Sequence, residues 1–178
     1  MRIRVPDRRE LPVLQDIERA AGRWFRDIDM PEIAEDDPPS VDKLASYQLA
    51  GRAWVVADPA DAPIGYLIAD VVDGNLHVAQ LSVHPDHARR GLGRRLLDHL
   101  VDQAALGGIP ALTLTTFAHV PWNAPYYLRC GFRVLADREL TAGLREIRQR
   151  EIAHGMDRWP RVCMRREVWA RRETPGPP

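Results

Sequence analysis

Residues 83–95 read Val83-His84-Pro85-Asp86-His87-Ala88-Arg89-Arg90-Gly91-Leu92-Gly93-Arg94-Arg95 and carry the clearest structural signal in this chain of 178 residues. A strand pattern ends at Val83, a loop with two glycines two positions apart follows, and a helical pattern begins at once. The start of a helix presents backbone N–H groups without partners at the positive end of the helix dipole. Glycine lets an anion approach the backbone closely and the arginines add positive charge, so the pattern favours a diphosphate ligand.

Two common nucleotide-binding motifs do not fit this turn. A P-loop requires Gly-Lys followed by Ser or Thr, and the only lysine of the chain is Lys43. A dinucleotide-binding turn requires a third glycine and an acidic residue on the next strand. The next predicted strand, residues 111–117, reads Ala-Leu-Thr-Leu-Thr-Thr-Phe and has no acidic residue.

The rest of the sequence predicts one α+β domain over residues 1–172, followed by a frayed tail at 173–178. Apolar patterns predict strands at 2–5, 53–57, 64–72, 76–83, 111–117, 132–135 and 162–169. Helical spacing predicts helices at 10–26, 40–49, 91–106, 122–130 and 139–154, with a loop at 27–40. Short turns between the second, third and fourth strands predict an antiparallel meander.

Composition limits the class of protein. Lysine plus arginine and aspartate plus glutamate both number 25, so the net charge of zero argues against sequence-independent nucleic-acid binding. The N-terminus lacks the apolar segment of a signal peptide, and no run approaches the roughly 18 apolar residues of a membrane span. We therefore expect a cytoplasmic protein without a membrane partner, in which Cys130 and Cys163 are half-buried free thiols.

A second informative segment, residues 120–132, reads Val-Pro-Trp-Asn-Ala-Pro-Tyr-Tyr-Leu-Arg-Cys-Gly-Phe. Taken alone, Tyr126 and Tyr127 would be interpreted as core aromatics. Together with the turn at 83–95, however, the segment resembles the GNAT superfamily of N-acetyltransferases. That family has an acyl-CoA signature Gln/Arg-x-x-Gly-x-Gly/Ala and a tyrosine four residues before Gly-Phe. The likeness covers roughly residues 2–135 and includes the order of the elements, and 139–154 looks like an insertion.

The resemblance implies a GNAT-like fold: a mixed, mostly antiparallel central sheet of about seven strands flanked by helices. It also implies acetyl-CoA as cosubstrate and Tyr127 as the general acid that protonates the departing CoA thiolate. Asn123 and the strand residues Leu81, Ser82 and Val83 would contact the pantetheine arm. The diphosphate would lie against Ala88, Arg89, Arg90, Gly91, Leu92, Gly93 and Arg94.

This chain departs from the family at two places. Ala88 stands where the family usually has Gln or Arg, so a neighbouring arginine would have to supply that cation. The strand before the turn has Gln80 but no carboxylate, although many members carry a general base there. The candidates for the base are Glu18, Asp29, Glu32, His77 and His119, and the sequence does not decide among them. Glu18 follows Ile17 on the first helix and could equally be an exposed surface residue.

Three functions remain open on sequence alone. The first is an acetyltransferase for a primary amine of a small molecule or peptide, and the second is a non-catalytic acyl-CoA-binding module. The third is an acetyltransferase directed at protein N-termini or lysines. No metal is expected, because His84 and His87 lack a third ligand at suitable spacing. The edge strands of such a sheet can pair two copies, so a homodimer also remains open.

Overall fold

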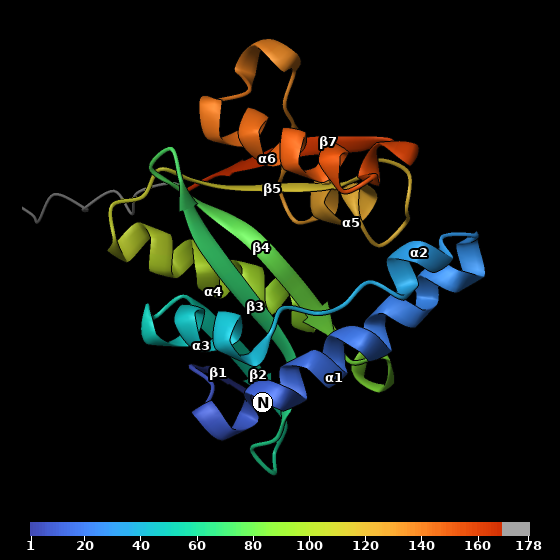
Figure 1. Ribbon diagram of the computed structural model, residues 1–178. Helices are drawn as coiled ribbons and strands as arrows, with labels where there is room; N and C mark the ends of the chain where they lie inside the picture. Colours follow the sequence, from blue (N-terminus) through green and yellow to red (C-terminus); the bar gives the residue numbers. More distant parts are fainter. Residues whose placement is uncertain (169–178) are drawn as a thin grey trace, which may run out of the picture. The chain divides into compact units, whose positions relative to one another are not determined.

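The computed structural model describes residues 1–168 and contains a seven-stranded sheet (Figure 1). The strands are β1 (Arg2–Arg4), β2 (Ala53–Ala57), β3 (Pro63–Val72), β4 (Asn75–Val83), β5 (Ala111–Phe117), β6 (Arg133–Val134) and β7 (Arg161–Glu167). The helices are α1 (Leu11–Gly22), α2 (Pro31–Ala34), α3 (Val41–Leu49), α4 (Leu92–Leu106), α5 (Ala124–Arg129) and α6 (Ala142–Ala153). The hydrogen-bonded strand order is β1-β2-β3-β4-β5-β7-β6. This confirms the predicted mixed, mostly antiparallel α+β sheet.

Local sequence signals explain several element boundaries. The Ser40 hydroxyl accepts a hydrogen bond from Lys43 N (3.2 Å) and caps α3, as its position before an apolar pattern predicts. Asp73 and Gly74, both with positive φ, form the two-residue turn between β3 and β4. Such a turn matches the twist of an antiparallel hairpin, which confirms this part of the predicted meander.

Three expectations need correction. Residues 27–40 are not all loop, because Pro31 starts the short helix α2, where its missing N–H costs nothing, and Met30 beside it is buried. The first helix ends at Gly22, and a 3-10 turn over Arg23–Ile28 continues it. The thiols of Cys130 and Cys163 are free but buried. The single domain through residue 172 stays a prediction, and residue 169 of the last predicted strand and the tail at 173–178 lie outside the described residues.

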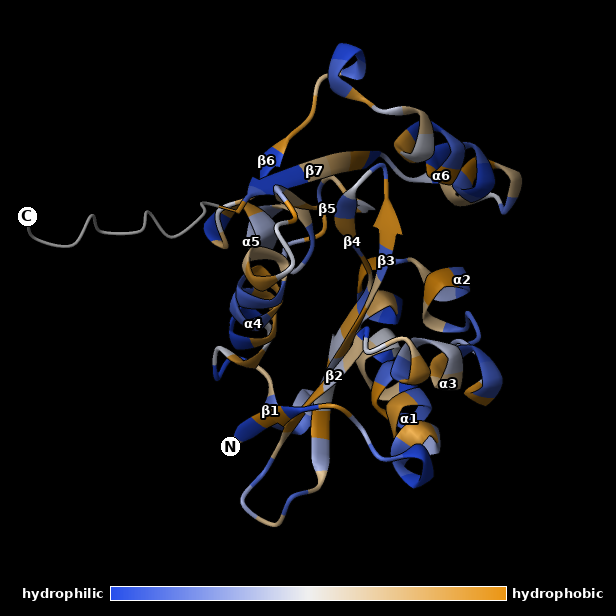
Figure 2. Ribbon diagram, turned by 90° about the vertical axis from the view of Figure 1, so that its left-hand side faces the viewer, coloured by the Kyte–Doolittle hydropathy of each residue, from blue (hydrophilic) through white to orange (hydrophobic). Residues whose placement is uncertain are grey.

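The chain divides into two compact units, of which the first comprises Met1–Asp70 and Val78–His99. In this unit α1 and α3 cover one face of β2 and β3 (Figure 2). The core there is made of Leu11, Leu14, Ile17, Leu44, Ala45, Tyr47, Ala53, Val55, Tyr66 and Ile68. The apolar stripe of α1 faces this core, as its helical spacing predicts.

The second unit comprises Val71–His77 and the chain from Leu100 onward. Here β5 pairs with β4 in parallel at Leu76 and His77, and with β7 in antiparallel register along its whole length. Helix α6 packs its buried Leu144 against Leu135 and Cys163. Among the helices that the structure describes, none is long and apolar enough to cross a membrane.

Helix α6 is also held by a buried cluster of charges around Glu151. Its carboxylate accepts hydrogen bonds from Arg161 (2.8 Å), Arg148 and the Thr115 hydroxyl. Burial by itself would raise the pKa of Glu151, but the bonds and charge of Arg161 and the other two partners outweigh it, so the pKa lies below its usual range. The ionised cluster therefore stabilises the packing of α6 on β5 and β7.

We expect Glu151→Gln to lower the free energy of unfolding by about 2–3 kcal/mol at pH 7, because it leaves the buried Arg161 without a charged partner. A carboxylate whose folded pKa is lowered contributes stability above its unfolded pKa and loses it as the pH falls through the folded pKa. The difference between the variant and the original protein should therefore shrink below about pH 4.3, the ordinary glutamate value. Urea unfolding at pH 7 and at acidic pH measures both effects.

Glu146→Gln is the matched control, since Glu146 lies on the same helix but is 69% exposed and pairs with Arg150 at 3.4 Å. An exposed pair of this kind contributes about 0.5 kcal/mol or less. Equal losses in the two variants at pH 7 would contradict a stabilising role for the buried cluster.

Candidate active site

The start of α4 has the geometry of an anion site. Arg89 and Gly91 both have positive φ (60° and 73°), and the first bond within the helix runs from Arg95 N to Gly91 O (3.1 Å). The N–H groups of the residues before Arg95 therefore have no acceptor in their own helix. A Cβ added to Gly91 would meet nothing within 4 Å, so the backbone here is open on that side. Arg89 and Arg90 are exposed beside it.

The end of β4 carries a small polar group on the face that α1 covers. His84 N donates to Ile64 O (2.9 Å), and a Cβ on Gly65 would lie 3.0 Å from Ser82 O. Because opposite residues of an antiparallel pair share a face, Tyr66 and Ser82 lie on the same side of the hairpin. Gln80, two residues before Ser82, donates from its amide to the Ser82 hydroxyl (3.0 Å).

A carboxylate of α1 points to this same face. The hydroxyl of Tyr66, a fully buried core residue, donates a hydrogen bond to Glu18, which is itself partly buried. Burial raises the pKa of Glu18 to about 7; the hydrogen bond from Tyr66 opposes this rise, and the negative charge of Asp36 adds to it. Glu18 is thus a partly accessible carboxyl group that exchanges its proton close to neutral pH.

In the second unit, Tyr127 lies on α5 with its ring edge-on to Tyr126 (5.5 Å between centroids) and Phe132 (5.6 Å). Burial, and to a smaller extent Cys130, raises its pKa well above the ordinary value, so the phenol stays protonated. Asn123, which precedes α5, donates from its amide to Thr116 on β5 (2.8 Å). Among residues 1–168 nothing donates a hydrogen bond to the buried Asn123 Oδ1.

The other candidates for a general base have different surroundings. His77 is buried, and its Nδ1 lies 3.0 Å from the hydroxyl of Thr113. Thr113 is the residue of β5 that pairs with His77 in the β4–β5 register. His119, Asp29 and Glu32 are exposed. Glu18, by contrast, is partly buried on α1, and burial raises the pKa of its carboxyl group to about 7.

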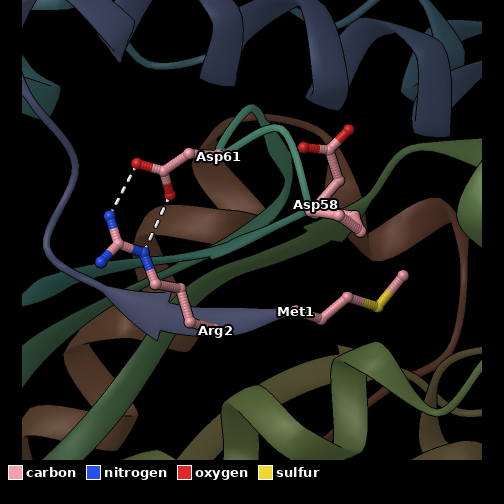
Figure 3. A pocket seen from close by; sticks show the side chains of 5 residues that line it. Met1, Arg2, Asp58 and Asp61 are labelled. Carbon is pink, nitrogen blue, oxygen red and sulfur yellow. Dashed lines mark hydrogen bonds and ion pairs between the residues drawn. The ribbon is translucent and has the colours of Figure 1, made fainter.

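Neither a surface hollow nor the arrangement of possible metal ligands among the described residues offers a reactive group. A surface hollow is lined by Met1, Arg2, Asp58, Pro59 and Asp61 (Figure 3). Its Asp61 carboxylate is already paired with Arg2 (2.7 Å) and Arg4 (3.1 Å), which hold the pKa of Asp61 below its usual range. Among the described residues no group of three or more His, Cys, Asp or Glu side chains is placed to hold a metal ion.

Sequence reasoning did not find the pairing of Glu18 with Tyr66 or of Asn123 with Thr116. One signal for Glu18 was present: it follows Leu11 and Leu14 at helical spacing and so shares their buried face. The partners themselves are 48 and 7 positions away in the chain, and helical periodicity carries no information about them.

Comparison with known proteins gives a consistent result. A family model described as the acetyltransferase (GNAT) family matches residues 14–132. The chain is 34% identical over 87 residues to a mycothiol acetyltransferase of Cellulomonas flavigena, covering 49% of this chain and 22% of that protein. It is 35% identical over 72 residues to the [ribosomal protein bS18]-alanine N-acetyltransferase of Salmonella typhimurium, covering 40% of this chain and 49% of that protein. The chain thus spans less than half the length of these two relatives.

Among solved structures, the fold is similar to that of the PaiA N-acetyltransferase from Thermoplasma acidophilum in complex with coenzyme A. The TM-score is 0.67 at 15% identity, over 93% of this chain and 98% of the other. At this identity the likeness establishes the fold, and the fold agrees with the family match.

The raised pKa of Glu18 predicts an unusual dependence of stability on pH. A carboxyl group whose folded pKa lies above its unfolded value stabilises the fold at low pH, and this contribution is lost as the pH rises from about 4.5 to about 7. Glu18→Gln, which keeps an acceptor for Tyr66 but has no charge, should therefore be as stable as the original protein near pH 5. At pH 8 it should be more stable, by on the order of 1–3 kcal/mol. Urea unfolding at the two pH values gives the difference.

Asp16→Asn serves as control, because Asp16 is on the same helix and 75% exposed, paired with Arg19 at 3.2 Å. It should change stability little at either pH. A Glu18→Gln effect that is the same at pH 5 and pH 8 would show that the carboxyl group does not titrate in this range.

Proposed function

The chain belongs to the acetyltransferase (GNAT) family, and on that premise we propose that it is an N-acetyltransferase that moves an acetyl group from acetyl-CoA to a primary amine. The observation that carries the proposal is the start of α4. There, the backbone at Arg89 and Gly91 has positive φ, the helical hydrogen bonds begin only at Arg95 N, and Arg89 and Arg90 lie exposed beside the helix start. This combination suits the diphosphate of a CoA thioester.

The described residues fit such a cosubstrate at two further points. The orphaned Oδ1 of Asn123 can accept a hydrogen bond from an amide of the pantetheine arm. The β4 backbone from Leu81 to Val83 can pair with that arm in the manner of an added strand, and its N–H groups can stabilise the negative oxygen formed during acyl transfer. The cosubstrate supplies an activated acetyl group, and these residues bind and orient it. Because Ala88 has no polar side chain, Arg89 or Arg90 would supply the positive charge beside the diphosphate.

Tyr127 is the proposed proton donor to the departing thiolate. An ordinary tyrosine titrates near 10 and an ordinary thiol near 8.5, so this transfer is uphill by roughly 2 kcal/mol. Burial raises the pKa of Tyr127 further, but an equally dry environment also raises the pKa of a thiol that leaves beside it. The difference between the two groups is therefore preserved, and Tyr127 contributes a moderate rate factor.

The proposal also includes the class of acceptor amine, a cytoplasmic location and the oligomeric state of the protein. The similarity to an alanine N-acetyltransferase of a ribosomal protein supports a peptide amine as one acceptor class, beside small-molecule amines. The two free, buried cysteines suit a reducing cytoplasm. Pairing of two copies as a homodimer stays a prediction. A non-catalytic acyl-CoA-binding module differs from the enzyme by binding acetyl-CoA without turnover.

The first test is a thermal melt with and without acetyl-CoA. Ligand at about 100 times Kd should stabilise the protein by roughly 2.7 kcal/mol, which corresponds to a rise in Tm of roughly 5–11 °C. CoA should give a similar shift. Gly91→Glu should abolish the shift, because it places a carboxylate where the diphosphate would bind.

Gly108→Glu is the matched control for this melt. Gly108 follows the other end of α4, has a similar φ (+66°) and likewise has nothing within 4 Å of an added Cβ. Both variants carry the same backbone strain and charge, but only Gly91→Glu should lose the response to acetyl-CoA. An unchanged melt of the original protein at saturating acetyl-CoA would refute the proposed cosubstrate.

The role of Tyr127 predicts that Tyr127→Phe lowers kcat by about 10²-fold, near the low end for general acids. Tyr126→Phe, a substitution of its neighbour on α5, should have a much smaller effect. Steady-state release of CoA thiol measures both rates. Full activity in Tyr127→Phe would remove this phenol from the mechanism.

A further inference from the structure

Under the proposed N-acetyltransferase function, on which this inference rests, the acceptor amine has to lose a proton before it attacks. An alkyl amine with a pKa near 10.4 is almost entirely protonated at pH 7 and cannot attack a thioester in that form. The strand before the turn has no carboxylate: its Gln80 cannot take a proton, and the ring of its His77 is buried 3.0 Å from the Thr113 hydroxyl. Some other group must remove it, and the described residues contain one suited to the task.

We propose that the Glu18 carboxylate is the general base that takes the proton from the acceptor ammonium, and that Tyr66 is the residue that positions it. Glu18 is partly buried on the face of the β3–β4 hairpin that carries Tyr66 and Ser82. The Tyr66 hydroxyl donates a hydrogen bond to the Glu18 carboxylate. This bond goes to one carboxylate oxygen, and within residues 1–168 no hydrogen bond reaches the other, so the group is oriented and can still accept a proton.

The contrast with Glu151 shows why Glu18 is suited to proton transfer. The Glu151 carboxylate accepts hydrogen bonds from two arginines and a hydroxyl, which keep it ionised and hold it in place. The groups that act on Glu18 are the Tyr66 hydroxyl from β3, the Asp36 carboxylate from the segment before α3, and its neighbour Arg19. With burial as the largest effect, they give Glu18 a pKa of about 7, where a base can both accept and release a proton.

The charge around Glu18 also favours a cationic acceptor. Residues 27–40 contain six carboxylates and no lysine or arginine. All six are exposed, and Asp36 among them acts electrostatically on Glu18. A protonated amine is attracted to such a surface, and its arrival beside Glu18 would lower the pKa of the carboxyl group and so generate the ionised base.

The proton balance of the transfer is complete with these groups. One N–H proton of the ammonium passes to Glu18, and the freed nitrogen lone pair forms the bond to the carbonyl carbon. The C–S bond breaks and its electron pair leaves with sulfur, which takes up a proton from Tyr127. The second proton lost by the nitrogen restores Tyr127 through solvent, and Glu18 releases its proton to water before the next turnover.

The test compares nucleophiles that differ in their need for a base. Spermidine and a peptide with a free lysine side chain are protonated at pH 7, whereas the nitrogen of hydroxylamine is already neutral. We expect Glu18→Gln to lower kcat/KM for the protonated amine by about 10²–10⁴-fold and to remove the rise in kcat/KM near pH 7, while transfer to hydroxylamine changes little. Tyr66→Phe should move that rise to higher pH, since the hydrogen bond favours the ionised carboxylate.

Controls separate this inference from the proposed function. Asp16→Asn, an exposed carboxylate on the same helix, should leave both substrates unaffected. Glu18→Gln should keep the melting shift with acetyl-CoA. An unchanged pH profile in Glu18→Gln, or an equal loss with hydroxylamine and the protonated amines, would overturn the role of Glu18 and leave the acetyltransferase intact. If the original protein binds acetyl-CoA but acetylates none of these amines, the enzymatic function itself is overturned, and this inference with it.

Discussion

A buried phenol needs a hydrogen-bond acceptor, and this requirement organises the first unit of the protein. Tyr66 is fully buried between α1, α3 and the strands, where an unpaired hydroxyl would cost about 1–3 kcal/mol. Its acceptor is Glu18, which Leu14 and Ile17 hold in place by burying the same helix against the core. The apolar packing of α1 therefore buries much of the Glu18 carboxyl group, and the loss of contact with solvent raises its pKa.

Two partly buried glutamates show how partners rather than burial alone decide the charge of a carboxyl group. Burial disfavours ionisation of both Glu18 and Glu151. Arg161 and Arg148 reverse this effect at Glu151, because an opposite charge at hydrogen-bond distance outweighs the loss of solvent. Within residues 1–168, Glu18 accepts a hydrogen bond only from the neutral hydroxyl of Tyr66, and the charges of Asp36 and Arg19 oppose each other, so the effect of burial prevails there. Glu151 therefore stays ionised and holds α6 in place, whereas burial disfavours the charge on Glu18 at neutral pH.

Much of the architecture followed from local patterns. Strands β2 and β5 begin and end where the apolar runs predict, and α3 begins directly after its predicted cap Ser40. The open helix start after Gly91 was also predictable, since it depends on a glycine and a helical pattern that are adjacent in sequence. Segments whose conformation depends on distant contacts were predicted less well. The short helix α2 was predicted as loop because residues 27–40 are rich in acidic residues and proline, and the sequence does not show that Met30 before it is buried. The two cysteines proved more deeply buried than expected.

By itself, the sequence determined the class of fold, the glycine turn at the start of α4 and the resemblance from which Tyr127 and Asn123 are proposed, because each depends on residues close together in the chain. Only the tertiary structure decided which carboxyl group has a pKa near neutrality. Glu18 and Tyr66 are 48 positions apart, and the shift in pKa arises from solvent excluded by the packing of α1 on β3. Burial and the approach of distant charges are properties of the folded chain, and for that physical reason the sequence did not decide among the candidate bases.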